Sequence, residues 1–293
     1  YKVAAGAGFD NFPRVLGQDV AGVVDAVGEG VTSVRVGDRV QYHGDLRKKY
    51  GAYAEYALTT ADTTVPIPDG VTDLDAAAVP CAAWTAYQAL HRKLHIAPAG
   101  TLVVAGASGG VGAAAVQLAK VVGCRVIGVC STANVEWVRE LGADDVVDYR
   151  TVADGDVAAA VRELTGGAGA EWWLDCVSSE SAHAGVTAAC FGGAVCSIGG
   201  VVATTAEDKV MQRALSISYC FLGMGHAAHD AARLDLPAIG RDVMGHLAAG
   251  RLKPCITKVV DLAGIPSTLD ELKSRRVRGK IAVKVHADAT GSA

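Results

Sequence analysis

The chain has 293 residues and a formal net charge of −4 at pH 7. Its hydrophobic share of 51% and its 35 glycines are typical of an α/β protein with buried strands and tight turns, and the length suits two domains. Because 31 acidic residues outnumber 27 basic ones, we expect neither nucleic acid nor an anionic membrane surface as a partner.

The eight cysteines contain no C-x-x-C spacing. This pattern indicates free thiols in a reducing cytoplasm and argues against a zinc knuckle or a redox pair. Two uncharged stretches, 100–119 and 184–206, are interrupted by one and two pairs of glycines respectively. We therefore expect each of them to form a strand and a helix, and neither to span a membrane.

Residues 15–60 are short apolar runs punctuated by glycine, which predicts antiparallel strands with tight turns. A helix broken at Pro80 is expected over 73–90. From about residue 95 to 225, strands and helices alternate, as in a doubly wound parallel sheet. The expected strands are 101–105, 125–129, 145–149, 172–177, 194–198 and 215–221.

The last part of the chain is expected to return to the first domain. A variable loop over 223–240 precedes a helix near 243–250 and a strand at 256–260. A second helix near 269–275 and a strand near 280–285 follow. The predicted domains are therefore 1–94, 95–225 and 226–293, where the last segment rejoins the first.

Residues 103–120 read VVAGASGGVGAAAVQLAK, so a glycine cluster joins an apolar run to a helical pattern that Gly123 should end. The spacing is that of the dinucleotide fingerprint G-x-G-x-x-G, with Ala107 in the first position. An ordinary tight turn would look alike, but the run at 125–129 completes a βαβ unit. Free N–H groups at a helix start hold phosphate, and glycine allows close approach. The predicted cofactor residues are Ser108, Gly109, Gly110, Val111 and Gly112.

The cofactor is predicted to be NADPH. An acidic residue about twenty positions after the glycines would bind the ribose 2′-hydroxyl of NAD. No Asp or Glu occurs between Lys120 and Asn134. Hydroxyls and an amide can instead donate to a 2′-phosphate, which makes Ser131, Thr132 and Asn134 candidate ligands. Ser131 or Thr132 could also cap a helix that starts near Val135.

Several segments together resemble the medium-chain dehydrogenase/reductase superfamily along nearly the whole chain. They are LGQDVAGVVDAVGEGV, VGDRV, GAYAEY, PCAAWTAYQAL, AGASGGVGAAAVQLAK, GADDVVDYR and RGKIAVKV. The resemblance is greatest to the zinc-independent quinone oxidoreductase and enoyl reductase branch. It implies a GroES-like catalytic domain with an inserted Rossmann domain, and a homodimer or tetramer joined through the last Rossmann strand. Such proteins carry a further segment before the position of Tyr1, so the chain is expected to begin inside the catalytic domain.

The resemblance implies no catalytic zinc. Zinc alcohol dehydrogenases have G-H-E-x-x-G, in which the His binds the metal, and this chain has Gln18 at the place of that His. Cys81 falls where those enzymes place a second ligand, but an amide is a poor zinc ligand. The pair His226 and His229 is the other metal-like spacing, and solvated or hydrogen-bonded histidines would give the same pattern.

Without a Lewis acid, reduction of a plain ketone is difficult because the developing alkoxide needs charge stabilisation. We therefore expect a conjugated acceptor, namely a quinone, an enone or an enoyl thioester. The resemblance implies that Thr85 contacts nicotinamide and that Tyr1 or Tyr42 donates a proton, although each could equally be a packing residue. A basic loop cluster, Arg47, Lys48 and Lys49, is either solvated or attracts an anionic substrate.

The resemblance also extends the list of cofactor residues. Asp175, Cys176 and Val177 end one Rossmann strand near the expected ribose, and Ile198, Gly199 and Gly200 end another. Tyr149 flanks the 2′-phosphate, Phe221 and Leu222 form a wall of the nicotinamide pocket, and Arg275 approaches the phosphates. The predicted function is an NADPH-dependent reductase of a small conjugated acceptor, acting as a homodimer in the cytoplasm. The alternatives are a zinc-type alcohol dehydrogenase and a non-catalytic NADPH-binding protein.

Overall fold

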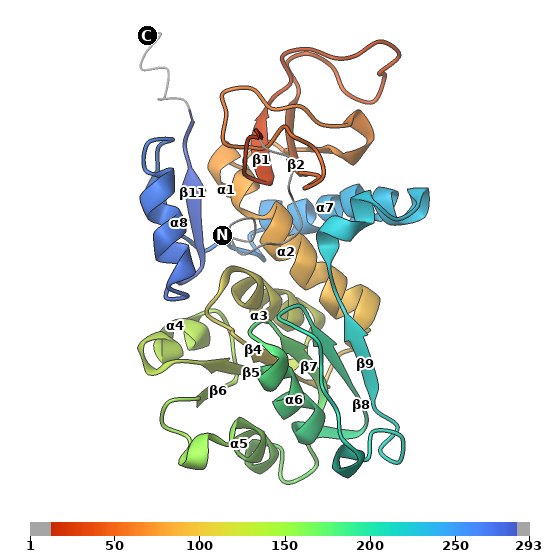
Figure 1. Ribbon diagram of the computed structural model, residues 1–293, viewed down its shortest axis with the longest axis vertical. Helices are drawn as coiled ribbons and strands as arrows, with labels where there is room; N and C mark the ends of the chain where they lie inside the picture. Colours follow the sequence, from red (N-terminus) through yellow and green to blue (C-terminus); the bar gives the residue numbers. More distant parts are fainter. Residues whose placement is uncertain (1–12, 286–293) are drawn as a thin grey trace. The chain divides into compact units, whose positions relative to one another are not determined.

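The computed structural model describes residues 13–285, which form two compact units (Figure 1). One unit runs from Thr85 to Phe221. The other combines the described chain up to Trp84 with the chain from Leu222 onward. The chain therefore leaves this second unit once and returns to it once.

The unit Thr85–Phe221 is built on a six-stranded sheet in which every pairing is parallel. The strand order is β6-β5-β4-β7-β8-β9, so the chain winds outward from β4 in both directions. The expected doubly wound α/β fold is confirmed, and each expected strand overlaps an observed one. The strands are β4 Thr101–Ala105, β5 Arg125–Cys130, β6 Asp145–Asp148, β7 Ala170–Asp175, β8 Ala189–Ser197 and β9 Ser216–Tyr219.

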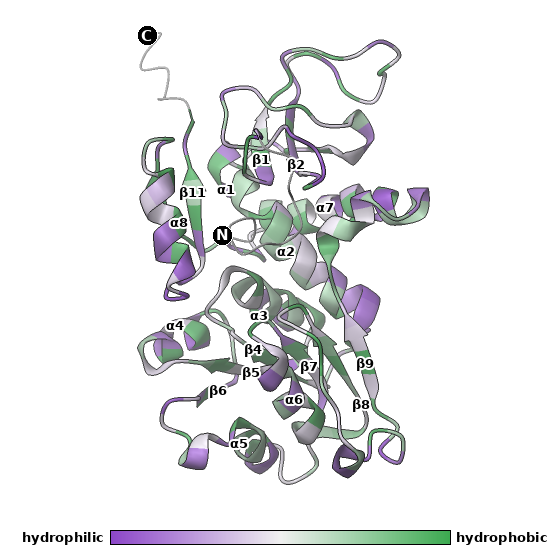
Figure 2. Cartoon of the chain, viewed as in Figure 1, coloured by the Kyte–Doolittle hydropathy of each residue, from purple (hydrophilic) through white to green (hydrophobic). Residues whose placement is uncertain are grey.

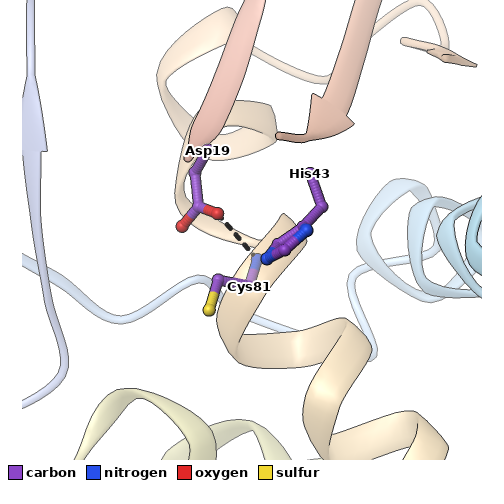
Figure 3. A group of neighbouring side chains, drawn as sticks. All are labelled: Asp19, His43 and Cys81. Carbon is purple, nitrogen blue, oxygen red and sulfur yellow. Dashed lines mark hydrogen bonds between the residues drawn. The ribbon is translucent and has the colours of Figure 1, made fainter. Parts of the chain in front are cut away.

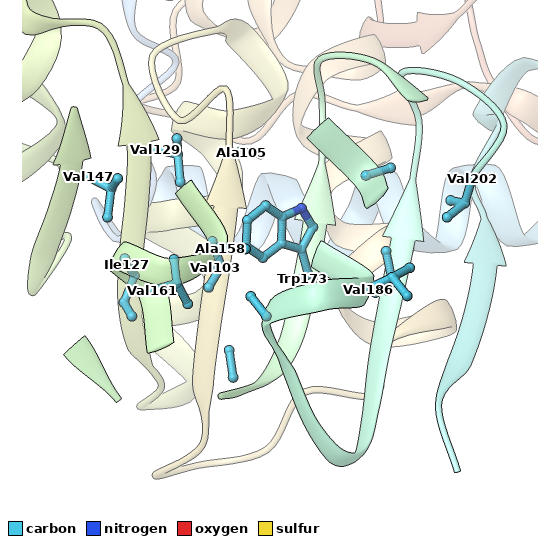
Figure 4. Packing of buried hydrophobic residues seen from close by; sticks show 14 residues of the cluster. Val103, Ala105, Ile127, Val129, Val147, Ala158, Val161, Trp173, Val186 and Val202 are labelled. Carbon is cyan, nitrogen blue, oxygen red and sulfur yellow. The ribbon is translucent and has the colours of Figure 1, made fainter. Parts of the chain in front are cut away.

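The core of this unit lies between the sheet and its helices. Trp173 of β7 is in the middle of a hydrophobic cluster with Val103, Ile127, Val161 and Val186 (Figure 4). The strands around it are hydrophobic along their length, as strands covered on both faces must be (Figure 2). The helices of the unit are α3 Gly110–Val122, α4 Val135–Glu140, α5 Val157–Leu164 and α6 Ser179–Ala188.

The turn between β4 and α3 requires glycine at two positions. Gly106 has a φ of +77°, and a Cβ on Gly112 would lie 2.2 Å from the carbonyl oxygen of Gly106. Gly109 is different, because its φ is −82° and its Cβ would stay 3.5 Å from the same oxygen. Gly123, with a φ of +93°, ends α3 as expected.

Replacing Gly112 with alanine should lower the free energy of unfolding by about 1–3 kcal/mol. The new Cβ would collide with the backbone of Gly106, which cannot move away as a flexible side chain could. Gly109→Ala is the matched control and should keep the wild-type stability. Urea denaturation followed by circular dichroism would measure both. Equal stabilities of the two variants would contradict the packing described for this turn.

The second unit contains the predicted antiparallel strands and a separate two-stranded ribbon. The antiparallel sheet has the order β1-β2-β3, with β1 Asp19–Val23, β2 Arg39–His43 and β3 Val65–Pro66. Strand β10 Ile256–Val260 pairs in parallel with β11 Lys280–Val283. The helices are α1 Asp73–Ala78, α2 Pro80–Tyr87, α7 Asp230–Ala248 and α8 Ile265–Lys273, and the unit boundary falls within α2.

Helix α7 corrects the expectation of a loop over 223–240. The helix begins after His229, whose Nδ1 accepts from the Ala232 N–H, and it continues through Pro237. A histidine cap and an internal proline are weak local signals for a helix. Packing supplies the missing stabilisation, since a Cβ on Gly240 would lie only 2.4 Å from the buried Trp84 ring.

Candidate functional site

Three strand ends meet at the carboxyl edge of the parallel sheet, the edge at which such folds bind ligands. A Cβ on Gly106, after β4, would lie 2.9 Å from Cγ2 of Val177, after β7. A Cβ on Gly199, after β8, would lie 2.6 Å from the carbonyl carbon of Val177. The fold thus brings the glycine turn together with two predicted segments, Asp175 to Val177 and Ile198 to Gly200.

Three predicted cofactor residues form one hydrogen-bonded cluster beside the glycine turn. The Nδ2 of Asn134 donates to Ser108 Oγ at 3.1 Å and to Ser131 Oγ at 3.2 Å. The alternative of a helix cap is wrong, because neither the short helix Thr132–Asn134 nor α4 has a side-chain cap. The two hydroxyls are held by an amide, so each can turn its proton toward a ligand.

The neighbouring strand end adds two residues that the sequence analysis did not identify. The register of β5 and β6 pairs Cys130 with Asp148. A hydrogen bond from Thr132 is the largest cause that lowers the pKa of Asp148. Beside it, the Arg150 guanidinium carbon lies 5.7 Å from the centre of the half-exposed Tyr149 ring. The Asp148 carboxylate, which accepts from Thr132, and the Arg150 guanidinium therefore lie at the same edge of the sheet. Of these two groups, the guanidinium is the one that attracts phosphate.

Asp175 is fully buried at the end of β7. It accepts from Ser197 Oγ at 3.2 Å and from the Val177 N–H at 3.3 Å. Burial raises the pKa of Asp175, and the hydrogen bonds offset only part of that increase. The Ser197 hydroxyl also lies 2.7 Å from the Gly200 carbonyl oxygen, so its single proton is shared between these two acceptors. The carboxyl group therefore organises the two strand ends that face the predicted cofactor position.

Asp175→Asn should change the pH dependence of stability. Because the folded-state pKa of Asp175 is raised, its stabilising contribution is complete below the unfolded pKa near 3.8 and is lost as the pH rises through the folded value. The variant should therefore gain stability relative to the wild type as the pH increases from acid to neutral. Thermal denaturation of both proteins across this range would measure the difference. A difference that does not vary with pH would contradict the assignment.

The structure gives less information about the predicted catalytic residues. Tyr1 lies outside the described residues. Tyr42 is buried on β2, burial raises its pKa to about 12, and its hydroxyl has no hydrogen-bond partner among residues 13–285. Thr85 is 7% exposed and lies in α2. The remaining three predicted contacts differ in environment: Phe221 is exposed, Leu222 is buried, and Arg275 has a φ of +57° just after α8.

A second cluster, which we call the Asp19 group, comprises Asp19, His43 and Cys81 (Figure 3). One oxygen, one ring nitrogen and the sulfur of these residues lie within 4.8 Å of one another. Asp19 begins β1, His43 ends β2, and Cys81 lies in the first turn of α2. Oδ1 of Asp19 accepts from the Cys81 N–H at 2.9 Å. The sequence analysis did not identify His43, because nothing local connects it to the other two residues.

Two further residues fix the Asp19 group from opposite sides. Lys280 of β11 donates from Nζ to Asp19 Oδ2 at 3.1 Å, and its side chain is only 22% exposed. Burial is the largest single influence and lowers the pKa of Lys280, but the charge and hydrogen bond of Asp19, together with Cys81 and Tyr53, outweigh it and raise the pKa. On the other side, His43 Nδ1 lies 3.4 Å from His226 Nε2, and the two rings stack. Burial lowers the pKa of His226, which favours a neutral ring that can accept the Nδ1 proton.

Two family models match the chain. The model described as alcohol dehydrogenase GroES-like domain matches residues 1–69, and the one described as zinc-binding dehydrogenase matches residues 110–235. The chain belongs to the medium-chain dehydrogenase/reductase superfamily. The expected combination of a GroES-like domain with a Rossmann-type sheet is thereby confirmed for this superfamily member.

Relatives of this superfamily member include oxidoreductases of two kinds. It is 42% identical over 149 residues to a chloroplast envelope quinone oxidoreductase homolog of Arabidopsis thaliana, covering 48% of this chain and 44% of that protein. It is 36% identical over 157 residues to a trans-enoyl reductase of Aspergillus terreus, covering 52% of this chain and 43% of that protein. The chain thus spans less than half the length of either curated relative.

Among solved structures, a mycobacterial protein complexed with NADPH is 26% identical and has a TM-score of 0.84. The match covers 96% of this chain and 85% of that chain. This likeness extends over both units, so the described architecture is that of a known nicotinamide-cofactor fold. Among residues 13–285, no helix is long and apolar enough to cross a membrane.

The zinc implied by one family model can be tested against the Asp19 group. A carboxylate, an imidazole and a thiolate are donors that zinc accepts, and three of them leave the open position of a catalytic site. However, the Asp19 carboxylate already receives the Lys280 ammonium and the Cys81 N–H. An ammonium on the carboxylate that would have to bind the metal opposes a second cation there. The residues therefore do not fit zinc while Lys280 is charged.

Proposed function

We propose that this protein is an NADPH-dependent, zinc-independent reductase that transfers hydride to a conjugated acceptor, namely a quinone, an enone or an enoyl thioester. The observation that carries the proposal is the polar cluster of Ser108, Ser131 and Asn134 beside the glycine turn. The cluster offers hydroxyl and amide donors where we expect a ribose 2′-phosphate, and the neighbouring Asp148 carboxylate is engaged by Thr132. The quinone oxidoreductase and enoyl reductase relatives support the acceptor class.

Each part of the carboxyl edge has a role in this proposal. N–H groups at the start of α3 bind the diphosphate, and Gly112 allows the helix to pack closely on the turn after β4. Ser131, Asn134 and the Tyr149–Arg150 pair hold the 2′-phosphate. Thr132 contributes less than expected, because its hydroxyl donates to Asp148. The bound cofactor supplies the hydride, and the strand ends at 175–177 and 198–200 orient its nicotinamide half.

The acceptor class follows from the charge that forms during the reaction. Hydride addition to a conjugated acceptor delocalises negative charge onto a carbonyl oxygen, so hydrogen-bond donors and a proton source suffice. Tyr42, Thr85 and Tyr1 are the proposed groups for this role. A phenol with a raised pKa stays protonated at neutral pH, so Tyr42 keeps the proton that it would donate.

The first test concerns the choice of cofactor. The wild type should bind NADPH at least tenfold more tightly than NADH, which is about 1.4 kcal/mol. Arg150→Ala should remove most of this preference by weakening NADPH binding alone. Arg139→Ala is a matched control, because Arg139 pairs with Glu136 on α4. Fluorescence titration would give all the dissociation constants. Equal wild-type affinities for NADPH and NADH would contradict the assignment of the 2′-phosphate ligands.

The second test concerns the acceptor. NADPH oxidation should be measured with a quinone, a simple enone, an enoyl-CoA and an aldehyde, each with and without a strong zinc chelator. We expect turnover of at least one conjugated acceptor, and the chelator should leave its rate within about twofold of the untreated value, because no step requires a Lewis acid.

The outcomes of this assay distinguish the alternatives. The donor types of the Asp19 group suit zinc, but the Lys280 ammonium on Asp19 opposes the metal, so the assay also tests a zinc-type alcohol dehydrogenase. Turnover of the aldehyde alone, lost on chelation, would establish that alternative. Tight NADPH binding without oxidation by any acceptor would instead indicate a non-catalytic binding protein.

We also propose a homodimer in the cytoplasm. Strand β9 is an edge strand of the parallel sheet and can pair with its counterpart in a second copy. The half-exposed Tyr219 on this strand would then be covered. The cytoplasmic location is supported by the eight cysteines, all of which are free thiols.

A further inference from the structure

The ammonium of Lys280 lies on the carboxylate that a metal ion in the Asp19 group would have to bind. Its Nζ lies 3.1 Å from Oδ2 of Asp19. Lys280 and Asp19 are both mostly buried, with side-chain exposures of 22% and 17%. The charge is therefore poorly screened by solvent, and it acts strongly on any other cation in the group.

The three donors of the Asp19 group are otherwise prepared for a metal. His226 faces Nδ1 of His43, which leaves Nε2 on the side of the ring toward Asp19 and Cys81 (Figure 3). A metal-binding histidine usually has its second nitrogen held in this manner. The Asp19 carboxylate is likewise held, because Oδ1 accepts from the Cys81 N–H. Three elements thus converge, and the carboxylate and the imidazole among their side chains are already held by hydrogen-bond contacts.

We propose that the Lys280 ammonium takes the place of a divalent cation in the Asp19 group, and that loss of its charge converts this group into a transition-metal site. The ligands of that site are a carboxylate oxygen of Asp19, Nε2 of His43 and the Cys81 thiolate. A mixed oxygen, nitrogen and sulfur set selects Zn²⁺ or Co²⁺ over Mg²⁺ or Ca²⁺. The imidazole comes from His43, and Gln18 has no part in the site.

The test compares variants that differ in charge at one position. Lys280→Met removes the charge and keeps most of the length, whereas Lys280→Arg keeps the charge. Lys258→Met is the matched control, because Lys258 lies on β10 of the same ribbon and forms an exposed ion pair with Glu271 of α8. Each protein is freed of metal with a chelator and titrated with Co²⁺, and the near-ultraviolet charge-transfer absorption of a cobalt–thiolate bond is recorded. Zinc content is measured separately by mass spectrometry after dialysis.

We expect Lys280→Met to bind Co²⁺ roughly a hundredfold more tightly than the wild type, because a neighbouring positive charge is gone. Lys280→Arg and Lys258→Met should behave like the wild type. Adding Cys81→Ser to Lys280→Met should abolish the charge-transfer band. Adding His43→Gln to Lys280→Met should weaken Co²⁺ binding. Adding Cys190→Ser, in the other unit, should change neither.

Two results would overturn the proposal. One is a wild type that binds Co²⁺ with the thiolate band, since Lys280 would then not exclude a metal; this result does not depend on any variant folding. The other is a Lys280→Met protein that keeps its circular dichroism spectrum but binds no Co²⁺. If the methionine variant is unstable, Lys280→Gln takes its place in this Co²⁺-binding measurement. The readout is metal binding, so the result is independent of the proposed reductase activity.

Discussion

The ion pair between Asp19 and Lys280 connects the first described strand of its unit with the last one. Between them lie the whole inserted unit and most of the second unit's own chain. The two side chains are mostly buried, so loss of either partner would leave a buried charge without compensation, which costs far more than loss of an exposed pair. The same carboxylate also accepts from the backbone of α2. One Asp therefore ties together β1, β11 and α2, and the orientation of Cys81 depends on it.

Much of the fold could be predicted because its signals are local. The buried strands are continuous apolar runs, and the glycine turn is recognisable because Gly106 needs a left-handed backbone and Gly112 needs close contact. Helix α7 was the exception, because its start depends on a histidine cap and its middle contains Pro237. Its stability comes from packing against Trp84, and local sequence does not contain that information.

The candidate site was only partly predictable, for a related reason. Ser108, Ser131 and Asn134 were found because two adjacent elements of one βαβ unit bring them together. Asp148 was not found, since only the register of β5 against β6 places it beside Thr132. His43 was not found either, because Asp19, His43 and Cys81 come from three separate elements. A residue that depends on a distant contact gives no periodic or spacing signal in a single sequence.

The Asp19 group also shows why a missing ligand in a motif does not settle the chemistry of a site. Gln18 at the expected histidine position argues against one metal geometry, yet His43 from the next strand supplies an imidazole to the same neighbourhood. What distinguishes this site from a metal centre is the resident cation. An ammonium is a weaker electrophile than zinc, but its three N–H groups can donate hydrogen bonds without any exchangeable ion. The Lys280 ammonium thus gives this carboxylate a covalently attached positive charge, where a metal centre would give it an exchangeable one.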